Sequence, residues 1–261
     1  MLARRQFLAL GAVVFVPRSV WAQGTTAAAP APAGLIEDLV AGNHILTTEG
    51  ILDGYGHISV RHPGNPARFL LARSVAPELV TAADIIEYGL DGEPIDAKGR
   101  ASYKERYIHS EIYRSRRDVN AVVHCHTPSL IPFADSTVPL RPMYHQSAFL
   151  AAGVPVFEIR QTAGMTNMLI ETVALGRALA KVLADKPALL MRGHGAVVVA
   201  DTIPNVVGRS IYLDLNARIQ AQAIALGGKI TYIDPEEAKK YAASDNYSRA
   251  WELWKRKAAG K

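Results

Sequence analysis

The sequence predicts an α/β fold in which helices pack around a central sheet. Short runs of strand character, such as GHISVRH and AVVHCHT, are interspersed with segments of helical apolar spacing, such as residues 35–49 and 104–116. Hydrophobic residues make up 49% of the 261 residues and aromatic residues only 7%, so the apolar mass is mostly aliphatic, which favours an α/β design over a sandwich of aromatic pairs. Since no internal repeat is visible, we expect one domain.

The expected elements follow one another along the chain. After the helix at 35–49 come strands at 56–62, 68–74 and 83–90, with a hairpin turn at Asp91-Gly92. The helix at 104–116 leads to a strand at 119–127, and we expect Thr127 to cap a short helix that Pro128 opens. A helix at 168–184, strands at 188–192 and 196–200, a long helix at 204–227 and a charged helical tail at 234–258 complete the prediction.

The first 22 residues have the features of an export signal. Arg4-Arg5 precede an apolar stretch from Phe7 to Val16, and Ala22 suits signal-peptidase cleavage. The run RRQFL resembles the twin-arginine signal of bacteria. We therefore expect a signal peptide at 1–22, an Ala/Pro linker at 23–34 and a periplasmic protein without stable membrane anchoring; if residues 1–22 are not a signal, the protein is cytoplasmic.

The charge and the cysteine content exclude two classes of protein. The formal net charge of +5 falls to about +2 without residues 1–22, which carry three arginines and no acidic residue. No basic run with interleaved aromatic residues remains, so we expect no nucleic-acid partner. Because Cys125 is the single cysteine, the chain has no internal disulfide, and a core, a metal ion or oligomerisation must stabilise it.

Two histidines lie one residue apart at the end of an expected strand, in AVVHCHT. Side chains alternate between the two faces of a strand, so His124 and His126 point to one side and Cys125 to the other. Two imidazoles on one face can bind one divalent ion, although a pair of buried, hydrogen-bonded histidines would show the same pattern. Cys125 is then expected to face the core as a small apolar residue.

His194 is the candidate for a third metal ligand. It lies between Gly193 and Gly195, which allow a tight turn between two expected strands. Three histidines with an open coordination position are typical of a catalytic metal site. Zinc, manganese and cobalt all accept imidazole ligands, so the residues alone do not fix the metal.

Glu105 begins the expected helix that precedes the H-x-H strand, and His109 lies one turn further on the same helix face. Beside a bound metal ion, this carboxylate is a candidate fourth ligand or general acid/base. The alternative is a solvated glutamate that the helix dipole favours at this position. His109 is expected to support a ligand or to pack in the core.

The segment YKERYIHSEIYRSRRDVNAVVHCHT, followed by RGHGAVVV, resembles the class II aldolase/adducin family. The spacing from Glu105 to His124 is similar to that between the acid/base carboxylate and the first metal histidine of the fuculose-phosphate aldolase branch. The resemblance covers residues 35–230 and implies a three-layer α/β/α sandwich with a central, mostly antiparallel sheet, followed by a helical tail at 231–261. It also implies a homotetramer with sites between subunits, a zinc or manganese ion on His124, His126 and His194, and Glu105 as acid/base or additional ligand.

The sequence departs from the sugar-phosphate members of that family where they bind phosphate. His57 replaces the asparagine of their G-N pair, Arg73-Ser74 stands in the T-G segment, and Lys104 stands in the S-S pair. Because arginine binds carboxylates in a bidentate manner, these cationic groups favour a carboxylate substrate, although Arg73 could instead serve a structural ion pair. Our candidates for substrate binding are His57, Ser59, Arg73, Ser74 and Lys104.

The stretch from GHISVRHP to RFLLARSVAPELVT resembles the decarboxylases of the family more closely than its aldolases. We therefore expect a metal-dependent carbon–carbon lyase, either a decarboxylase or an aldolase, that acts on a small hydroxy-carboxylate or hydroxy-carbonyl compound. The metal would stabilise the enolate or carbanion left by bond cleavage, and Glu105 would transfer the proton. The alternatives are a sugar-phosphate aldolase or epimerase of the same family, an adducin-like interaction module without catalysis, and a metallohydrolase.

Overall fold

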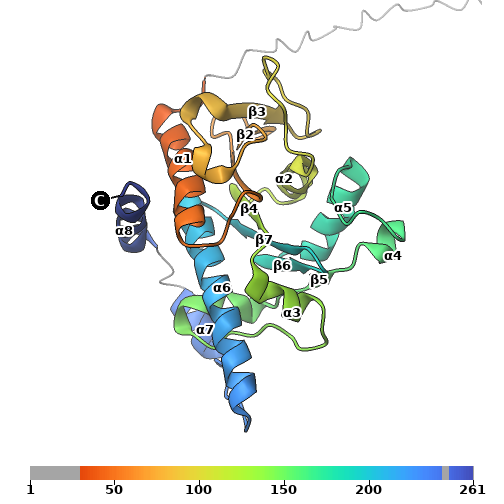
Figure 1. The fold of residues 1–261 in the computed structure, drawn as a ribbon, viewed down its shortest axis with the longest axis vertical. Coiled ribbons are helices and arrows are strands. Elements are labelled where there is room, and N and C mark those ends of the chain that lie inside the picture. Colours follow the sequence, from red (N-terminus) through yellow and green to blue (C-terminus); the bar gives the residue numbers. More distant parts are fainter. Residues whose placement is uncertain (1–29, 243–246, 261) are drawn as a thin grey trace, which may run out of the picture.

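A computed structural model describes residues 30–242 and 247–260 as a sheet with helices on both faces (Figure 1). Its seven strands are β1 (His57–Arg61), β2 (Arg68–Ala72), β3 (Ile85–Gly89), β4 (Ala121–Cys125), β5 (Val156–Phe157), β6 (Ala188–Met191) and β7 (Gly195–Ala200). The α-helices are α1 (Ala33–Thr48), α2 (Arg106–Ser115), α3 (Ile131–Ala134), α4 (Arg160–Ala163), α5 (Val173–Leu183), α6 (Ile203–Leu226), α7 (Pro235–Ala242) and α8 (Ser248–Ala258). Among the described residues, no helix is long and apolar enough to cross a membrane.

The strands form one sheet in the order β3-β2-β1-β4-β7-β6-β5. Every neighbouring pair is antiparallel except β5 and β6, which are parallel. The predicted mixed α/β fold with a mostly antiparallel sheet is therefore confirmed. β4 lies in the middle of this order, so the H-x-H strand is flanked by β1 on one side and β7 on the other.

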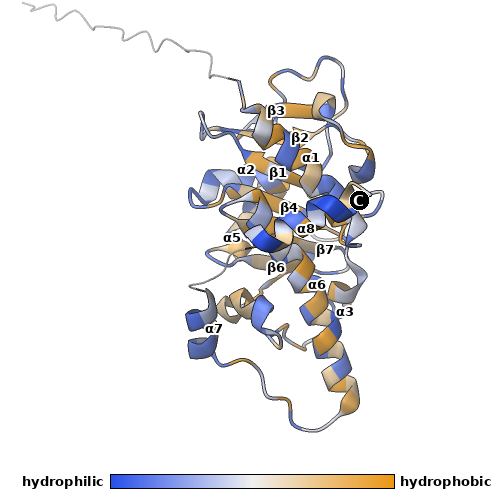
Figure 2. Ribbon diagram, turned by 90° about the vertical axis from the view of Figure 1, so that its left-hand side faces the viewer, coloured by the Kyte–Doolittle hydropathy of each residue, from blue (hydrophilic) through white to orange (hydrophobic). Residues whose placement is uncertain are grey.

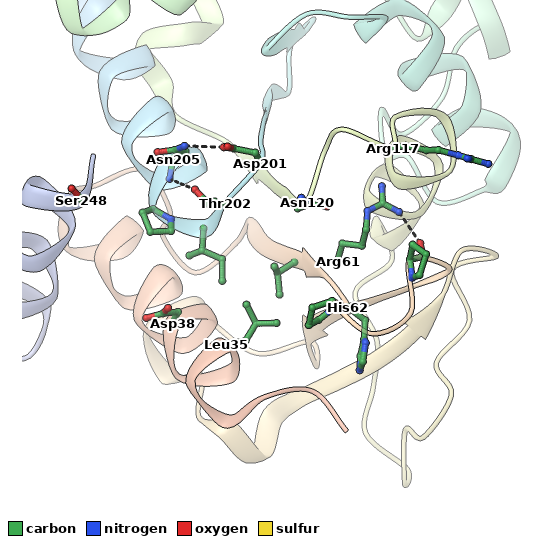
Figure 3. Close-up of a pocket in the computed structure, with 15 residues that line it drawn as sticks. Leu35, Asp38, Arg61, His62, Arg117, Asn120, Asp201, Thr202, Asn205 and Ser248 are labelled. Atoms are coloured by element: carbon green, nitrogen blue, oxygen red, sulfur yellow. Dashed lines mark hydrogen bonds between the residues drawn. The ribbon is translucent and has the colours of Figure 1, made fainter. Parts of the chain in front are cut away.

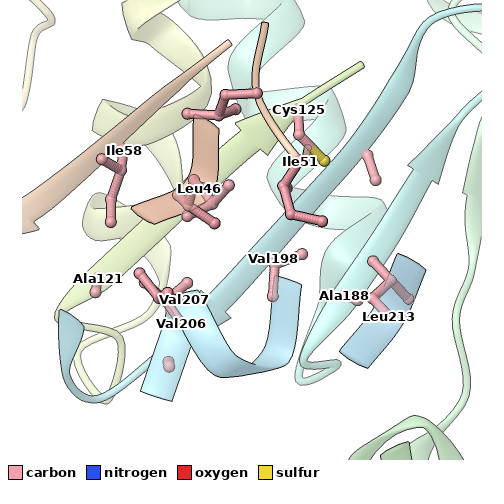
Figure 4. Close-up of a cluster of buried hydrophobic side chains, with 14 of the residues drawn as sticks. Leu46, Ile51, Ile58, Ala121, Cys125, Ala188, Val198, Val206, Val207 and Leu213 are labelled. Atoms are coloured by element: carbon pink, nitrogen blue, oxygen red, sulfur yellow. The ribbon is translucent and has the colours of Figure 1, made fainter. Parts of the chain in front are cut away.

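Two hydrophobic cores lie on opposite faces of the sheet. In the first, α6 packs on the face of β4 that includes Ala121 and Cys125 (Figure 4), and α1 and α8 add further side chains to the same core. In the second, α2 and α5 pack on the residues that alternate with them, including Val122. This alternation confirms that Cys125 faces a core, and it directs His124 to the side of α2 and α5.

The C-terminal helix α8 is attached through aromatic side chains. Much of its surface is hydrophilic (Figure 2), whereas Trp251 and Trp254 are buried in the first core together with Tyr247. These three aromatic side chains thus hold the tail against α1 and α6. This part of the chain was predicted to be helical, and the structure contains two helices there, α7 and α8.

Three local predictions differ from the structure. The first helix begins at Ala33, inside the predicted linker. The predicted signal peptide and the linker up to residue 29 lie outside the described residues. Thr127 stands before a short 3-10 helix but does not cap it, because its hydroxyl donates to the Ile51 carbonyl instead. The helix predicted at 168–184 begins only at Val173, capped by the Thr172 hydroxyl, because the preceding backbone serves the site described below.

The close approach of α5 to α2 gives a test of this packing. A Cβ at Gly176 would lie 2.3 Å from the Tyr107 carbonyl oxygen of α2, whereas a Cβ at Gly34 of α1 would meet nothing within 4 Å. We predict that Gly176→Ala lowers the free energy of unfolding by about 1–3 kcal/mol, because backbone cannot yield as a side chain does. Gly34→Ala is the matched control and should be neutral or slightly stabilising. Urea unfolding of both variants measures the difference, and equal stabilities would contradict the packing.

Candidate metal centre and substrate cavity

His124 and His126 meet at the end of β4. His124 is fully buried, opposite His57 of β1 and Val197 of β7 in the sheet register. His126 follows directly after the strand, and the two Nε2 atoms lie 3.0 Å apart. The Nδ1 atom of His124 lies 3.1 Å from the carbonyl oxygen of Ala196, so backbone pairing with β7 orients the ring.

His194 reaches the same point from the turn between β6 and β7. Gly193 takes a φ of +63°, and a Cβ at Gly195 would lie 2.0 Å from the Cys125 carbonyl oxygen. Both glycines are therefore required for the turn to pack against β4. The Nε2 atom of His194 lies 3.1 Å from that of His126, and its Nδ1 lies 3.0 Å from the Met168 carbonyl oxygen.

Glu105 completes the cluster from the start of α2. It occupies the N-cap position without a capping hydrogen bond. Its Oε2 lies 3.3 Å from His124 Nε2 and 3.5 Å from His194 Nε2, while Oε1 accepts a hydrogen bond of 2.9 Å from the Ile170 amide. The carboxylate thus faces the histidines, and the alternative of a solvated helix-start glutamate does not hold. The backbone around Met168 and Ile170 orients two of the four side chains, which explains why this segment is not helical.

The four side chains fit a divalent metal ion. One ligand atom from each of Glu105, His124, His126 and His194 lies within 4.8 Å of all the others. Because the Nδ1 atoms of His124 and His194 each face a carbonyl, they carry the ring protons, and the Nε2 lone pairs converge. Converging acceptors without a donor repel one another unless a cation lies between them. Three imidazoles and a carboxylate are a ligand set of catalytic zinc and related metals.

The electrostatics agree with such a site. Burial raises the pKa of Glu105, but His124 and His194, in the protonated forms that they can take without a metal ion, outweigh burial through charge and hydrogen bonds and hold that pKa far below its usual range. Burial, together with the nearby charge of His124, lowers the pKa of His126 to about 4. An ionised carboxylate and a neutral imidazole are the forms that bind metal.

A cavity of about 350 Å³ opens beside the cluster. Its wall includes Glu105 and His126 together with three of the predicted substrate-binding residues, His57, Ser74 and Lys104. Tyr55, Tyr103 and Leu169 also line it, and none of these three residues was predicted to do so from the sequence. Isolated tyrosines in loops carry no distinguishing pattern, so only the fold reveals their position.

The structure does not bring the other two candidates, Arg73 and Ser59, into this cavity. The Arg73 guanidinium lies 2.5 Å from an Asp84 carboxylate oxygen, and Asp84 also accepts hydrogen bonds from the Thr81 backbone and hydroxyl. Ser59 is fully buried and contacts His109 and Tyr113. The structural ion pair considered for Arg73 is therefore the arrangement observed.

A larger cavity, about 940 Å³, lies at the opposite ends of the same strands (Figure 3). It is bordered by Arg61, Asn120 and Asp201, where β1 ends, β4 begins and β7 ends, and by Leu35 of α1. Backbone carbonyl oxygens accept four of the five N–H donors of the Arg61 guanidinium, which leaves at most one for a ligand. None of the four clustered side chains borders this cavity, and the chemistry is therefore assigned to the smaller one.

Comparison with known proteins identifies the family. Residues 37–221 match the model of the class II aldolase and adducin N-terminal domain. The chain belongs to the class II aldolase/adducin family. The resemblance seen in the sequence implies a divalent metal ion, and the cluster of Glu105 and the three histidines could hold one.

Relatives of this class II aldolase/adducin chain include decarboxylases and aldolases. The chain is 34% identical to the decarboxylase tropJ of Talaromyces stipitatus over 86% of its own length and 94% of the relative's. It is 29% identical to the 3,4-dihydroxyphthalate decarboxylase of Arthrobacter keyseri, covering 84% of the chain and 92% of the relative. The structure of L-fuculose 1-phosphate aldolase from Glaciozyma antarctica PI12 superposes with a TM-score of 0.69 at 25% identity, covering 88% and 91%. These similarities support a lyase of this family.

The cluster predicts one divalent ion per chain. We expect calorimetric titration of chelator-treated protein with Zn²⁺ or Mn²⁺ to show one site. His194→Ala should lower the metal affinity by more than roughly 10- to 100-fold, which is the loss typical of removing a residue that only hydrogen-bonds a metal ligand. His145→Ala is the control, because the exposed His145 ring contacts Tyr144 and Tyr241 instead. Equal affinities for the two variants would rule out His194 as a ligand.

Proposed function

We propose that this protein is a divalent-metal-dependent carbon–carbon lyase that decarboxylates a small hydroxy-carboxylate. The observation that carries the proposal is the cluster of Glu105 and three histidines beside a cavity that also contains Lys104. A metal ion held by the Nε2 atoms of the histidines would supply a Lewis acid for the negative charge that bond cleavage leaves. The similarity to two decarboxylases over more than nine-tenths of their length favours CO₂ as the leaving group.

Lys104 is the cation best placed to bind the substrate carboxylate. Its side chain is exposed at the cavity, and no ion pair or hydrogen bond of its ammonium group is found within residues 30–242 and 247–260. Ser74 adds a hydroxyl to the same wall. Arg73, by contrast, is neutralised by Asp84. An uncompensated ammonium group beside a hydroxyl suits an anionic oxygen group.

Glu105 is proposed as the residue that moves the proton. Its carboxylate is ionised, because the neighbouring histidines hold its pKa low despite burial. It can therefore accept the proton of the substrate hydroxyl and return it to the carbon from which CO₂ leaves. The hydrogen bond from the Ile170 amide to Oε1 leaves Oε2 as the atom directed at the cluster.

Aldol cleavage is the second candidate, and the structural similarity to L-fuculose 1-phosphate aldolase favours it. The same cluster would serve, but an aldehyde would leave instead of CO₂. A sugar-phosphate substrate for aldol cleavage or epimerisation fits less well, since His57 and Lys104 stand where those family members are expected to bind phosphate. An adducin-like interaction module would need none of the four clustered side chains, and a metallohydrolase would attack esters or amides.

Product analysis separates these functions. Metal-loaded protein is supplied with hydroxyaryl carboxylates, α-hydroxy acids, aldols and esters, and CO₂, aldehyde and acid release are followed. We expect CO₂ release by the wild type and a loss of at least about 100-fold in kcat for Glu105→Gln, with metal content unchanged. Aldehyde release would establish the aldolase, ester hydrolysis the hydrolase, and the absence of any turnover with bound metal the interaction module.

Lys104 and Arg73 provide a matched pair for substrate binding. We predict that Lys104→Met raises KM about tenfold or more with little change in stability, because it removes a cation at the cavity. Arg73→Met should leave KM unchanged and cost up to about 1 kcal/mol of stability, as expected for a partly exposed ion pair with Asp84. Steady-state kinetics and urea unfolding measure both effects. A raised KM in Arg73→Met instead would return Arg73 to the substrate site.

We also propose that the protein is exported to the periplasm through residues 1–22 and assembles as a homotetramer, with cavities that neighbouring subunits complete. The arginine pair and apolar stretch at the N-terminus support export, and the family resemblance supports the tetramer. Fractionation of cells that produce wild-type protein or a variant with Arg4 and Arg5 replaced by lysine tests export. Light scattering of the purified protein tests the tetramer.

A further inference from the structure

A line of four buried side chains leads from the cavity wall into the second core. His57 Nδ1 lies 2.6 Å from His109 Nε2, His109 Nδ1 lies 2.6 Å from Ser59 Oγ, and Ser59 Oγ lies 2.7 Å from the Tyr113 hydroxyl. The four side chains come from β1 and α2, and none is more than 3% exposed. Such a line is held by one proton in each of its three hydrogen bonds.

The proton count leaves one donor for an end of the line. His57 and His109 are buried, and among the described residues neither ring hydrogen-bonds a carboxylate, so each ring is counted as neutral with one N–H. Burial raises the pKa of the Tyr113 hydroxyl, so it keeps its proton, as does Ser59. The line thus contains four protons but only three hydrogen bonds. The remaining proton must point outward, either from the Tyr113 hydroxyl or from the His57 ring.

The two ends differ in what they can offer this proton. In the part of the chain that the structure describes, the Tyr113 hydroxyl has no acceptor other than Ser59, and it is buried in the core. An outward proton there would remain unsatisfied. His57, in contrast, lines the cavity together with Glu105, its ring centroid lies 5.2 Å from that of His124, and its Nδ1 faces His109, which leaves Nε2 for the cavity side. The hydrogen bonds therefore run from Tyr113 through Ser59 and His109 to His57.

We propose that His57 presents its Nε2–H as a fixed hydrogen-bond donor to the substrate oxygen that gains negative charge during bond cleavage. In this proposal, which rests on the proposed lyase function, His109, Ser59 and Tyr113 are positioning residues that keep His57 in the Nε2–H tautomer. A substrate oxygen that reaches the metal ligands comes within range of this donor, because His57 and His124 are neighbours in the sheet register. A donor already aimed at a developing charge needs no rearrangement during the reaction.

Nitrogen-15 NMR of histidine-labelled protein tests the tautomer directly. The His57 signals are assigned by their loss in His57→Gln. We expect a protonated Nε2 and an unprotonated Nδ1 in the wild type, and a mixture of tautomers in Tyr113→Phe, where the donor that sets the direction is missing. Tyr88→Phe is the matched control, since Tyr88 is equally buried in the same core but bonds Ser102. A protonated Nδ1 in wild-type His57 would overturn the proposal whether or not the protein proves to be a decarboxylase.

Kinetics with the substrate found above test the role of the donor. We expect His57→Leu to lower kcat about 100-fold with KM and metal content nearly unchanged, and to lower the melting temperature because the buried His109 Nε2–H loses its acceptor. His57→Gln keeps an N–H at similar reach and should regain at least about tenfold of that loss. Tyr113→Phe should lower kcat several-fold, and Tyr88→Phe should leave it unchanged. Equal activity of His57→Leu and wild type, or no recovery in His57→Gln, would contradict a hydrogen-bond donor at His57 Nε2. An inactive wild type would contradict the lyase function. In that case the tautomer of His57 measured by NMR would decide whether His57 Nε2 is a donor.

Discussion

The convergence of three imidazole Nε2 atoms at one end of the sheet is the constraint on which the rest of the site depends. His124 and His126 come from the end of β4, and His194 from the turn that begins β7, so the pairing of β4 with β7 sets their separation. Lone pairs this close are unfavourable without a cation, and the fold must hold them there. Backbone carbonyls of Ala196 and Met168 do so by fixing the tautomers of His124 and His194.

The antiparallel sheet also explains why the site is at one end of the molecule. At this end β1 begins, β4 finishes and β7 begins, and the start of α2 adds Glu105 above them. The other end of the same strands has the larger cavity, but backbone carbonyls take four of the five N–H donors of Arg61 there. Cavity size is therefore a poor guide to the candidate active site in this protein, and a cluster of titratable side chains with shifted pKa values is a better one.

Sequence reasoning predicted the part of the site that depends on local spacing. The H-x-H pattern placed His124 and His126 on one face of a strand, and the glycines around His194 indicated a tight turn. Glu105 was harder, because a helix-start glutamate has a simpler explanation, and only the family resemblance favoured the cluster. The parts that were missed depend on contacts distant in the sequence: the Asp84 ion pair of Arg73, the tyrosines of the cavity, and the line from His57 to Tyr113. Residues 168–172 were predicted as helix, since the sequence does not show that their backbone serves His194 and Glu105.

X-ray absorption spectroscopy of the zinc-loaded protein would show directly whether three histidines hold a catalytic metal ion. We predict three imidazole nitrogens at about 2.0–2.1 Å, one or two oxygen ligands and no sulfur, because Cys125 faces the opposite core. His126→Ala should lose one of the three imidazoles. A sulfur ligand, or fewer than two imidazoles in the wild type, would rule out this metal site.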